Sequence, residues 1–367
     1  MVPQAGNRTA ARTSGVSQLT QPREGLPHRA ARIEDAFHAF REERARRRGL
    51  TPTVIPYRGY GGKGWIRVLG RVLLVRPVRP KAAAKPRNRS VRGWRSFTSV
   101  PVNDVAVTIT AGGRDYHVTA DRGGVVDTHV EVNLPFGWNT IQLRTDDSLT
   151  VEAPVYVVDP GVKFGILSDV DDTVMVTALP RPLLAAWNTF VLDEHARRPV
   201  PGMAVLYERL VRAHAGAPVI YLSTGAWNVA PTLRRFLGRN LYPAGALLLT
   251  DWGPTHDRLF RSGREHKRDN LARLATEFPD VKWLLFGDDG QHDEELYRDF
   301  AREHPNNVAA ICIRQLSTSE AVWAGGRSTL ADDASESEDG IKWIFAPDGA
   351  GLSEQLTAAG LLPVYPA

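Results

Sequence analysis

Between residues 162 and 316, short apolar runs alternate with stretches of helical periodicity, and this alternation constrains the fold more than any other feature. The apolar runs are residues 162–167, 218–222, 246–249, 283–286 and 308–313. The helical stretches are residues 202–214, 230–239, 264–277 and 292–304. Strands that are apolar on both faces and joined by helices are typical of a doubly wound parallel sheet. The sequence therefore predicts an α/β domain over residues 161–316.

The preceding segment, residues 65–160, consists of short runs in which Val, Ile and Leu alternate with polar residues. Gly-Gly, Asp-Asp and Pro breaks separate these runs, which is typical of an antiparallel β-sandwich. The glycine-rich stretch before it carries no nucleotide-binding pattern and is expected to be a loop without a strand before it. The other expected divisions are a disordered basic N-terminus (1–27), an amphipathic helix and glycine-rich loop (28–64), and an acidic linker and C-terminal tail (317–367).

Charge is unevenly distributed along a chain whose formal net charge is only +5. Residues 51–95 contain twelve Lys or Arg and no Asp or Glu. Such segregation indicates an anionic partner, although a solvated basic segment gives the same pattern. We expect residues 51–95 to contact an anionic membrane surface, with nucleic acid the less favoured partner. The densest run contains Arg76, Arg79, Lys81, Lys85, Arg87, Arg89 and Arg92.

Several features bear on the compartment. No stretch approaches 18 consecutive apolar residues, so no transmembrane helix is expected. The first thirty residues lack an apolar segment, which argues against a secretory signal. The single cysteine, Cys312, lies in an apolar run and is expected to be a buried hydrophobe. These features predict a cytoplasmic protein, peripheral on the inner membrane surface if the basic segment binds lipid.

Polar residues follow the apolar runs at the edge where a parallel sheet has its active crevice. Asp169 and Asp171 follow the first run, and two carboxylates at this spacing can share one Mg²⁺ ion and one phosphoryl group. Ser223 and Thr224 follow the second run, where a hydroxyl and free backbone N–H groups can hold phosphoryl oxygens. Taken alone, the first pair also fits an acidic turn and the second a helix N-cap.

The later part of the domain adds a basic and an acidic motif. Lys267 opens the helix expected at 264–277, where its ammonium can offset charge on a transferring phosphoryl group. Asp288 and Asp293 follow the fourth run and can complete an oxygen-only Mg²⁺ site. A solvated lysine and an acidic helix start are the simpler interpretations of each alone. The order of all four motifs at successive strand ends favours a single phosphoryl-transfer site.

This ordered set resembles the haloacid dehalogenase superfamily over residues 162–316. A closer resemblance is to the actin-patch phosphatidate phosphatase catalytic-domain family and its bacterial relatives. The phrases that carry it are SDVDDTV, YLSTGAWN, LLTDWG, HKRDNL, FGDDGQHDEELY and WIRVLGRVL. Gly225 and Ala226 depart from the Ser-Pro that is more usual in the family. The implied fold is a haloacid-dehalogenase-like three-layer domain with a minimal cap, residues 174–201, preceded by the β-sandwich.

The resemblance also implies roles for individual residues. Asp169 would be the nucleophile and Asp171 the general acid and base, with Ser223, Thr224 and Lys267 binding the phosphoryl group. A Mg²⁺ ion would be held by Asp169, Asp171, Asp288 and Asp293, with Asp171 contributing its backbone carbonyl. Asp172 and Asp289 are expected farther from the metal. Trp227 and Asn228 are candidates for the substrate pocket, although core packing is the simpler interpretation of Trp227.

These inferences predict a Mg²⁺-dependent phosphatase that works through an aspartyl-phosphate. The resemblance implies phosphatidate or a related lipid phosphate as substrate, released as diacylglycerol and phosphate. Two alternatives stay open: a polynucleotide-end or small-metabolite phosphatase of the same superfamily, and a non-catalytic membrane-surface interaction protein. The complete set of carboxylates and lysine argues against the non-catalytic alternative.

Overall fold

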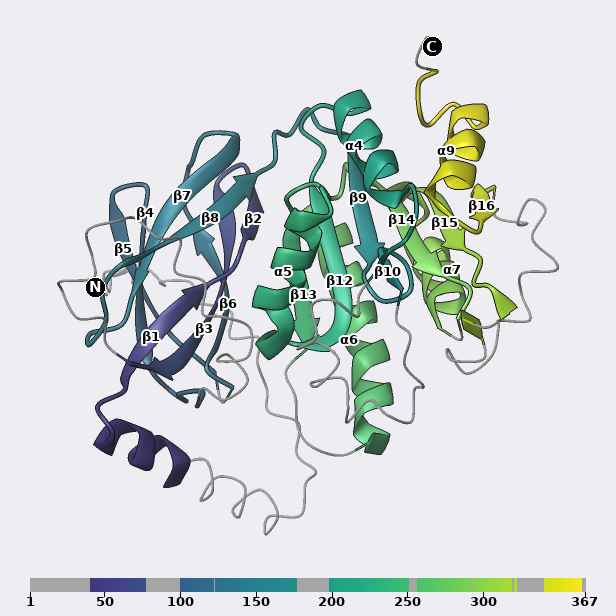
Figure 1. Ribbon diagram of the computed structural model, residues 1–367. Helices are drawn as coiled ribbons and strands as arrows, with labels where there is room; N and C mark the ends of the chain where they lie inside the picture. The colour runs from purple at the N-terminus through teal and green to yellow at the C-terminus, as the bar shows by residue number, and fades with distance from the viewer. Residues whose placement is uncertain are drawn as a thin grey trace, which may run out of the picture. The chain divides into compact units, whose positions relative to one another are not determined.

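The computed structural model describes residues 40–76, 100–121, 123–176, 198–250, 256–290, 292–318, 320–321 and 340–364, without the side chains of residues 256–262. All strands of this described part belong to one compact unit, Glu42–Ala367, whose two large sheets are visible in Figure 1. Residues 40–47 are helical. The expectations for residues 1–27, for most of the amphipathic helix and for the basic run from Arg79 to Arg92 lie outside the described residues.

Eight strands form the first sheet, which we call the β domain. They are β1 (Thr51–Pro56), β2 (Gly59–Gly62), β3 (Trp65–Val75), β4 (Ala106–Ala111), β5 (Arg114–Thr119), β6 (Val125–Glu131), β7 (Gly137–Arg144) and β8 (Val151–Val157). They follow one hydrogen-bonded path, β1–β3–β2–β8–β7–β4–β5, with β6 paired to β3. The alternating apolar residues turn inward, and Ile66, Val107 and Ile141 are buried. The pairing is antiparallel except between β2 and β8, which run parallel.

The β domain begins at Thr51. The prediction of a glycine-rich loop within residues 28–64 is therefore wrong, because residues 51–56 and 59–62 form strands. Strand β1 pairs with β3, and the glycine-rich stretch forms β2. A Cβ atom at Gly59 would lie 2.4 Å from the carbonyl oxygen of Arg67, and one at Gly61 would lie 2.4 Å from that of Trp65. These glycines therefore permit a close approach of β2 to β3, although glycine is usually a sign of a loop.

Six parallel strands form the second sheet. They are β9 (Phe164–Asp169), β12 (Val219–Ala226), β13 (Ala246–Thr250), β14 (Lys282–Asp288), β15 (Val308–Arg314) and β16 (Trp343–Ala346). Their spatial order is β13–β12–β9–β14–β15–β16. Counted along the chain this is the order 3-2-1-4-5-6 of doubly wound sheets, whose ligands bind beyond the carboxyl ends of the strands where the order reverses. Here the reversal lies between β9 and β14.

Helices pack against this sheet (Figure 1), and every residue of its edge strand β13 is buried. The helices are α4 (Met203–Ala213), α5 (Ala230–Arg239), α6 (His256–Glu277), α7 (Asp293–Glu303) and α9 (Gly349–Ala358). Helix α4 contacts α9, and α6 contacts α7. The apolar residues Met203, Leu206 and Leu210 recur on one side of α4 and are buried, as expected for an amphipathic helix on a sheet.

Helix α6 begins at His256 and is longer than the stretch expected at 264–277. Lys267 therefore lies in the middle of this helix and not in its first turn. Gly263 lies within the helix, where a Cβ atom would be 3.0 Å from the Cγ2 atom of Thr224. A glycine in a helix usually weakens it, but here it lets α6 pass close to the end of β12.

The second sheet extends beyond residue 316, so the division that assigned residues 317–367 to a linker and tail is also wrong. Strand β16 pairs in parallel with β15, and α9 packs on β16 and α4. The backbone N–H of Gly349 donates to the carbonyl of Pro201 at 2.9 Å. A Cβ atom on Gly349 would lie 2.3 Å from the backbone nitrogen of Met203, so only glycine permits this approach.

The small cap insertion expected at residues 174–201 is described only at its base. Strand β10 (Met175–Val176) pairs with β11 (Arg198–Pro199) in antiparallel fashion. Residues 177–197 lie outside the described part of the chain. The two short strands bring the ends of the insertion together directly after the loop that follows β9.

The β domain and helix α6 share a partly buried contact. The hydroxyl of Tyr60 donates to Glu277 Oε2 at 2.7 Å, and Arg67 Nη1 donates to Glu277 Oε1 at 3.1 Å. Arg67 also pairs with Asp127 at 2.5 Å. One cation of the basic segment is thus neutralised by acidic residues distant in sequence, which composition alone did not reveal.

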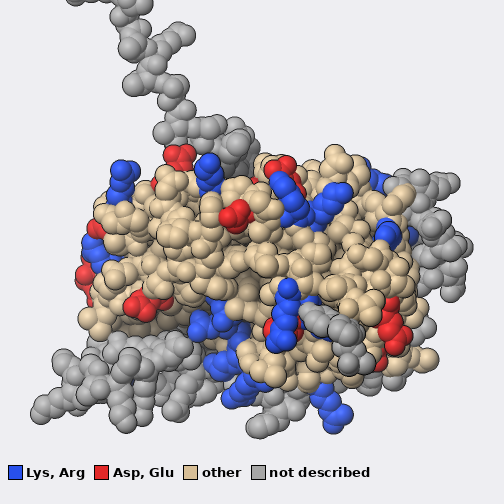
Figure 2. Space-filling model, turned by 90° about the horizontal axis from the view of Figure 1, so that it is seen from above, with Lys and Arg blue, Asp and Glu red and all other residues tan. Residues whose placement is uncertain are grey.

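Figure 2 shows Lys and Arg side chains on the viewed face of the molecule, several of them gathered in the lower half of the view. Within the described ranges, no helix is both long enough and apolar enough to cross a membrane.

Candidate active site

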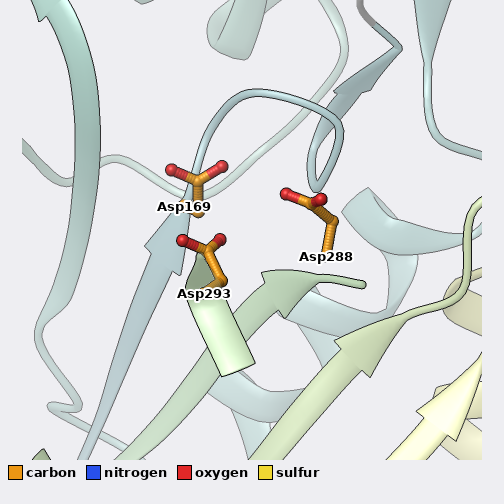
Figure 3. A group of neighbouring side chains, drawn as sticks. All are labelled: Asp169, Asp288 and Asp293. Carbon is orange, nitrogen blue, oxygen red and sulfur yellow. The ribbon is translucent and has the colours of Figure 1, made fainter. Parts of the chain in front are cut away.

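Three aspartates converge beyond the strand ends at the reversal point of the second sheet. Asp169 ends β9, Asp288 ends β14, and Asp293 begins α7. One carboxylate oxygen from each lies within 4.8 Å of the others, and Figure 3 shows the three side chains around a common space. All three residues are buried. The sheet order therefore places side chains from distant parts of the sequence in a single cluster.

Lys267 supplies the positive charge of this cluster. Its ammonium lies 2.7 Å from Asp169 Oδ1 and 2.6 Å from Asp293 Oδ1. Because Lys267 lies in the middle of α6, it is held on a regular helix that contacts β12 and β13. It bridges the proposed nucleophile and a proposed metal ligand, a contact that sequence order alone did not predict.

Gly287 brings Asp293 close to the end of β14. A Cβ atom at Gly287 would lie 2.9 Å from Asp293 Cβ and 2.7 Å from a ring carbon of Tyr297. The Tyr297 hydroxyl donates to the carbonyl of Phe286 at 2.8 Å and ties the first turn and a half of α7 to β14. The glycine before the aspartate pair is therefore required by packing, because any larger residue would push Asp293 away.

Asp171 and Ser223 face each other at the ends of β9 and β12. The Ser223 hydroxyl donates to Asp171 Oδ2 at 3.0 Å and accepts from the Gly225 N–H at 3.0 Å. The Asp171 side chain is thus engaged with Ser223 and lies outside the three-carboxylate cluster. Thr224 is exposed beside Ser223, at the same strand end. This geometry suits a carboxyl that exchanges protons next to a bound phosphoryl group.

Arg314, the last residue of β15, holds the loop that follows β9. Arg314 Nη1 donates to the carbonyl of Asp172 at 2.7 Å, Nη2 pairs with Glu320 at 2.7 Å, and Nε donates to the carbonyl of Pro347 at 3.2 Å. Asp172 has a positive φ of 56°, uncommon for a residue other than glycine. Arg314 therefore holds a strained loop that carries Asp171.

The buried carboxylates strongly affect one another. Burial raises the pKa of Asp169 well above its ordinary value, and the carboxylates of Asp293, Asp171 and Asp288 raise it further, while Lys267 opposes them. Burial and Asp293 likewise raise the pKa of Asp288. Burial alone would lower the pKa of Lys267, but Asp169 and Asp293 raise it above its ordinary value. The lysine therefore stays charged, and the aspartates need more positive charge than it supplies.

The donor set fits a hard divalent cation. It contains only carboxylate oxygens, which Mg²⁺ prefers. Asp293 Oδ2 is buried and has no hydrogen-bond partner within the described ranges. Buried carboxylate oxygens without partners are costly unless a cation or a proton satisfies them. Asp288 Oδ1 accepts from the Gly290 N–H at 2.7 Å, which fixes its orientation.

The other candidate residues have structural contacts. Trp227 is buried, and its ring stacks on Tyr57 with centroids 5.0 Å apart. This supports the packing interpretation of Trp227 over a place in a substrate pocket, while Asn228 is partly exposed beside it. Asp289 accepts from the N–H of Leu316 at 2.8 Å and joins β14 to the end of β15.

Sequence reasoning missed Arg314 and, although it noted a glycine turn at Gly287, the packing role of that glycine. Both lie directly at strand ends, Arg314 immediately after the apolar run at 308–313. The available signal for Arg314 was its position: a charged residue directly after an apolar run, at the carboxyl edge of the sheet. Its partner, however, is a backbone carbonyl 142 residues away, which no side-chain pattern reveals.

Comparison with known proteins gives a family match for this part of the chain. Residues 164–315 match the model of the family described as phosphatidate phosphatase APP1, catalytic domain. Phosphatidate phosphatase APP1 of Saccharomyces cerevisiae is 25% identical over 247 residues, which cover 63% of this chain and 41% of that protein. An uncharacterized protein of Schizosaccharomyces pombe is 25% identical over 152 residues, covering 41% of this chain and 25% of the relative.

This chain therefore spans less than half the length of the curated relatives that it matches. The family match supports the prediction that the chain is an enzyme of the phosphatase class, a phosphoric monoester hydrolase. Among solved structures, a carbohydrate acetylesterase from Xanthomonas citri is similar over 72% of this chain and 68% of its own, at 11% identity and a TM-score of 0.27. A likeness this weak carries no argument about fold or function.

Arg314 provides a first test of how the site is held. In Arg314→Met, a side chain of similar length loses its bonds to Asp172 and Glu320. We expect kcat to fall by about a hundredfold, because misplacing a reacting group by an ångström has an effect of this size. KM should change much less. The measurement is steady-state turnover of an aryl phosphate below the unfolding temperature, with circular dichroism to verify folding.

The matched control is Glu320→Gln, which breaks the ion pair but leaves the bond from Arg314 to Asp172. Its kcat should stay within about threefold of the parent, since the bond from Arg314 to the Asp172 carbonyl still holds the loop. Equal losses of kcat in both variants would show that Arg314 acts through general stability and not through the loop.

Proposed function

We propose that this chain is a Mg²⁺-dependent phosphatase that hydrolyses phosphatidate or a related lipid phosphate through an aspartyl-phosphate on Asp169. The observation that carries the proposal is the cluster of Asp169, Asp288, Asp293 and Lys267 at the reversal point of the sheet. Buried carboxylates around a lysine suit phosphoryl transfer, in which positioning and charge neutralisation contribute most of the catalysis. The matched catalytic domain supports the same reaction class.

Asp169 and Asp171 carry out the phosphoryl and proton transfers in two steps. A carboxylate oxygen of Asp169 attacks phosphorus, and the bond from phosphorus to the alcohol oxygen breaks. Asp171, protonated at the start, gives its proton to the departing oxygen. It then takes a proton from the water that attacks the phosphorus of the aspartyl-phosphate and frees Asp169. Ser223, hydrogen-bonded to Asp171, orients its carboxyl group.

One lysine and a divalent cation balance the negative charge of the site. Lys267 offsets negative charge on Asp169 and on the transferring group. Asp169, Asp288 and Asp293, with the backbone carbonyl of Asp171, would hold Mg²⁺, which would supply further positive charge beside the phosphoryl oxygens. The domain is proposed to be haloacid-dehalogenase-like, with the insertion based on β10 and β11 as its minimal cap. The 3-2-1-4-5-6 strand order is compatible with this.

The lipid preference and the membrane contact are parts of the same proposal. The description of the matched family as a phosphatidate phosphatase supports a lipid phosphate as substrate. A substrate in a bilayer requires the enzyme to adsorb, and each Lys or Arg near an anionic leaflet contributes about 1 kcal/mol. Within residues 51–95, Arg67 is neutralised by Asp127 and Glu277 and is not available for this purpose. The contact would therefore depend on the other basic residues of the segment.

A panel of phosphate esters tests the function. We expect kcat/KM with Mg²⁺ to be at least about tenfold higher for phosphatidate in mixed micelles than for oligonucleotide 3′- and 5′-phosphates or sugar phosphates, as a built pocket for the correct class provides. Phosphate release is the readout. Preference for oligonucleotide ends would favour the polynucleotide alternative. A folded protein that turns over no ester, including an aryl phosphate, would favour the non-catalytic alternative.

A further inference from the structure

The carboxyl end of β12 departs from regular pairing with its neighbour β13. Leu222 pairs with Leu248, but the next pair is Ala226 with Thr250. Residues 223–225 of β12 therefore stand opposite a single residue of β13, and we call these three residues the β12 bulge. A bulge interrupts the hydrogen-bonded ladder and re-aims the side chains that it carries. This bulge carries both of the hydroxyl groups that are proposed to bind the phosphoryl group.

The side chain of Thr250 holds this bulge. Thr250 is the last residue of β13 and is buried. Its hydroxyl donates to the carbonyl of Thr224 at 2.9 Å and also lies 3.2 Å from the carbonyl of Gly225, so the two carbonyls share one proton. Helix α6 packs against the same bulge, because a Cβ atom at Gly263 would lie 3.0 Å from Thr224 Cγ2. Backbone carbonyls taken out of a ladder need such a partner when they are buried.

A chain of hydrogen bonds leads from Thr250 to Asp171. The carbonyl of Thr224 and the N–H of Gly225 belong to one trans peptide, in which the two groups point in opposite directions. Binding of the carbonyl to Thr250 therefore directs the N–H away from Thr250. This N–H donates to Ser223 Oγ at 3.0 Å, and the Ser223 hydroxyl donates to Asp171 Oδ2 at 3.0 Å. All the donors of this chain point the same way, and hydrogen bonds in such a series strengthen one another.

We propose that Thr250 is a positioning residue, which fixes the β12 bulge and, through the Thr224–Gly225 peptide and Ser223, orients the carboxyl group of Asp171. The inference rests on the proposed function, in which Asp171 gives its proton to the departing oxygen. The hydroxyl of Thr250 is engaged with two backbone carbonyls and acts on Asp171 only through this chain. Reacting groups must be held to within a fraction of an ångström, so loss of the first link should slow proton donation.

The first experiment removes the hydroxyl of Thr250 in the full-length protein. Thr250→Val keeps the shape of the side chain and loses the donor, whereas Thr250→Ser keeps the donor. The matched control is Thr145→Val in the β domain, because Thr145 is also buried and its hydroxyl donates to the carbonyl of Pro52 at 2.9 Å. We expect kcat/KM for an alkyl phosphate to fall by about tenfold or more in Thr250→Val. Thr250→Ser and Thr145→Val should stay within about threefold of the parent, since both keep the chain to Asp171.

A comparison of leaving groups separates positioning of Asp171 from general stability. The ratio kcat/KM reports on the steps up to transfer of the phosphoryl group to Asp169. An alkyl alcohol needs a proton in order to leave, whereas nitrophenolate leaves without one. The loss in Thr250→Val should therefore be at least about threefold larger for an alkyl phosphate than for nitrophenyl phosphate. Equal losses for the two esters, or a Thr250→Ser variant as slow as Thr250→Val, would overturn the proposal. Thr250→Ala gives the same comparison if Thr250→Val is poorly folded.

The second experiment does not depend on turnover. Thermal unfolding of the same variants is followed with Mg²⁺ in inorganic phosphate and in chloride of equal ionic strength. Phosphate should raise the unfolding midpoint of the parent and of Thr145→Val, and Thr250→Val should lose at least about half of that shift, because the bulge no longer holds its hydroxyls in place. A parent that hydrolyses no ester, but whose phosphate shift depends on Thr250, would refute the proposed function and support the role of Thr250 in the bulge. A parent that hydrolyses esters, beside a Thr250→Val variant with parental activity and a full phosphate shift, would refute the role of Thr250 alone.

Discussion

Replacing Asp169 by Asn is expected to lower kcat by at least about a thousandfold while the fold stays intact, because an amide cannot form the aspartyl-phosphate. The amide has almost the same shape as the carboxylate, so the packing around β9 should survive. The variant should also lose the mutual repulsion that raises the pKa of Asp169 above its ordinary value. In the absence of metal, its unfolding midpoint should therefore be no lower than that of the parent near neutral pH.

The sign of this stability effect follows from linkage. An acid whose pKa is raised by folding favours the folded state at low pH, and this contribution is lost as pH rises through the raised pKa. An uncharged Asn at position 169 avoids that loss of folding stability. The matched control is Asp280→Asn, an exposed aspartate paired with Lys163, which should keep parental turnover. Turnover of a generic aryl phosphate by the purified, folded Asp169→Asn protein at more than a few per cent of the parent would refute the nucleophile assignment.

Removal of the divalent cation is expected to abolish turnover, and Mg²⁺ should restore it. Asp169, Asp288 and Asp293 offer only hard oxygen ligands, which suit Mg²⁺ and not zinc. In Asp288→Asn, the Mg²⁺ concentration for half-maximal activity should rise by roughly tenfold or more, because even a group that only orients a metal ligand commonly contributes that much and Asp288 is itself a proposed ligand. The KM for the phosphate ester should change less, because Lys267 and Ser223 remain.

A readout independent of turnover accompanies this prediction. Mg²⁺ should raise the unfolding midpoint of the parent, because it binds the folded state and relieves repulsion among the buried carboxylates. The same addition should have a smaller effect on Asp288→Asn. Full activity in EDTA, or activity restored by zinc in place of Mg²⁺, would contradict the cation site.

The parts of the fold that could be predicted from the sequence are those in which one local signal dominates. The five apolar runs became β9, β12, β13, β14 and β15, because strands buried on both faces need nearly continuous apolar residues. The short apolar run at residues 341–345 was not assigned to the sheet, because the strand it forms, β16, is only four residues long and follows an acidic stretch. The first turns of α6 were not predicted because Gly263 resembles a helix end. In the structure this glycine lies inside the helix and permits a close contact with Thr224.

The candidate site divides in the same way. Asp169, Asp288 and Asp293 could be predicted as neighbours, because the carboxyl ends of parallel strands share one edge of a sheet. The pairing of Lys267 with two of them could not, since it depends on where the helix α6 crosses that edge. The bond from Arg314 to Asp172 depends on a backbone carbonyl in a loop with positive φ. Such contacts arise only from the three-dimensional arrangement.

The position of β16 at the edge of the second sheet also has a consequence for how the protein folds during its synthesis. During synthesis, the ribosome delivers all strands of the β domain before residue 158, so that sheet can close early. The second sheet cannot, because β15 pairs with β14 on one side only, and its other partner, β16, appears when residues 343–346 have emerged. Until then β15 presents an unpaired edge, a known template for wrong strand pairing. The second sheet can thus be completed only late in the synthesis of each chain.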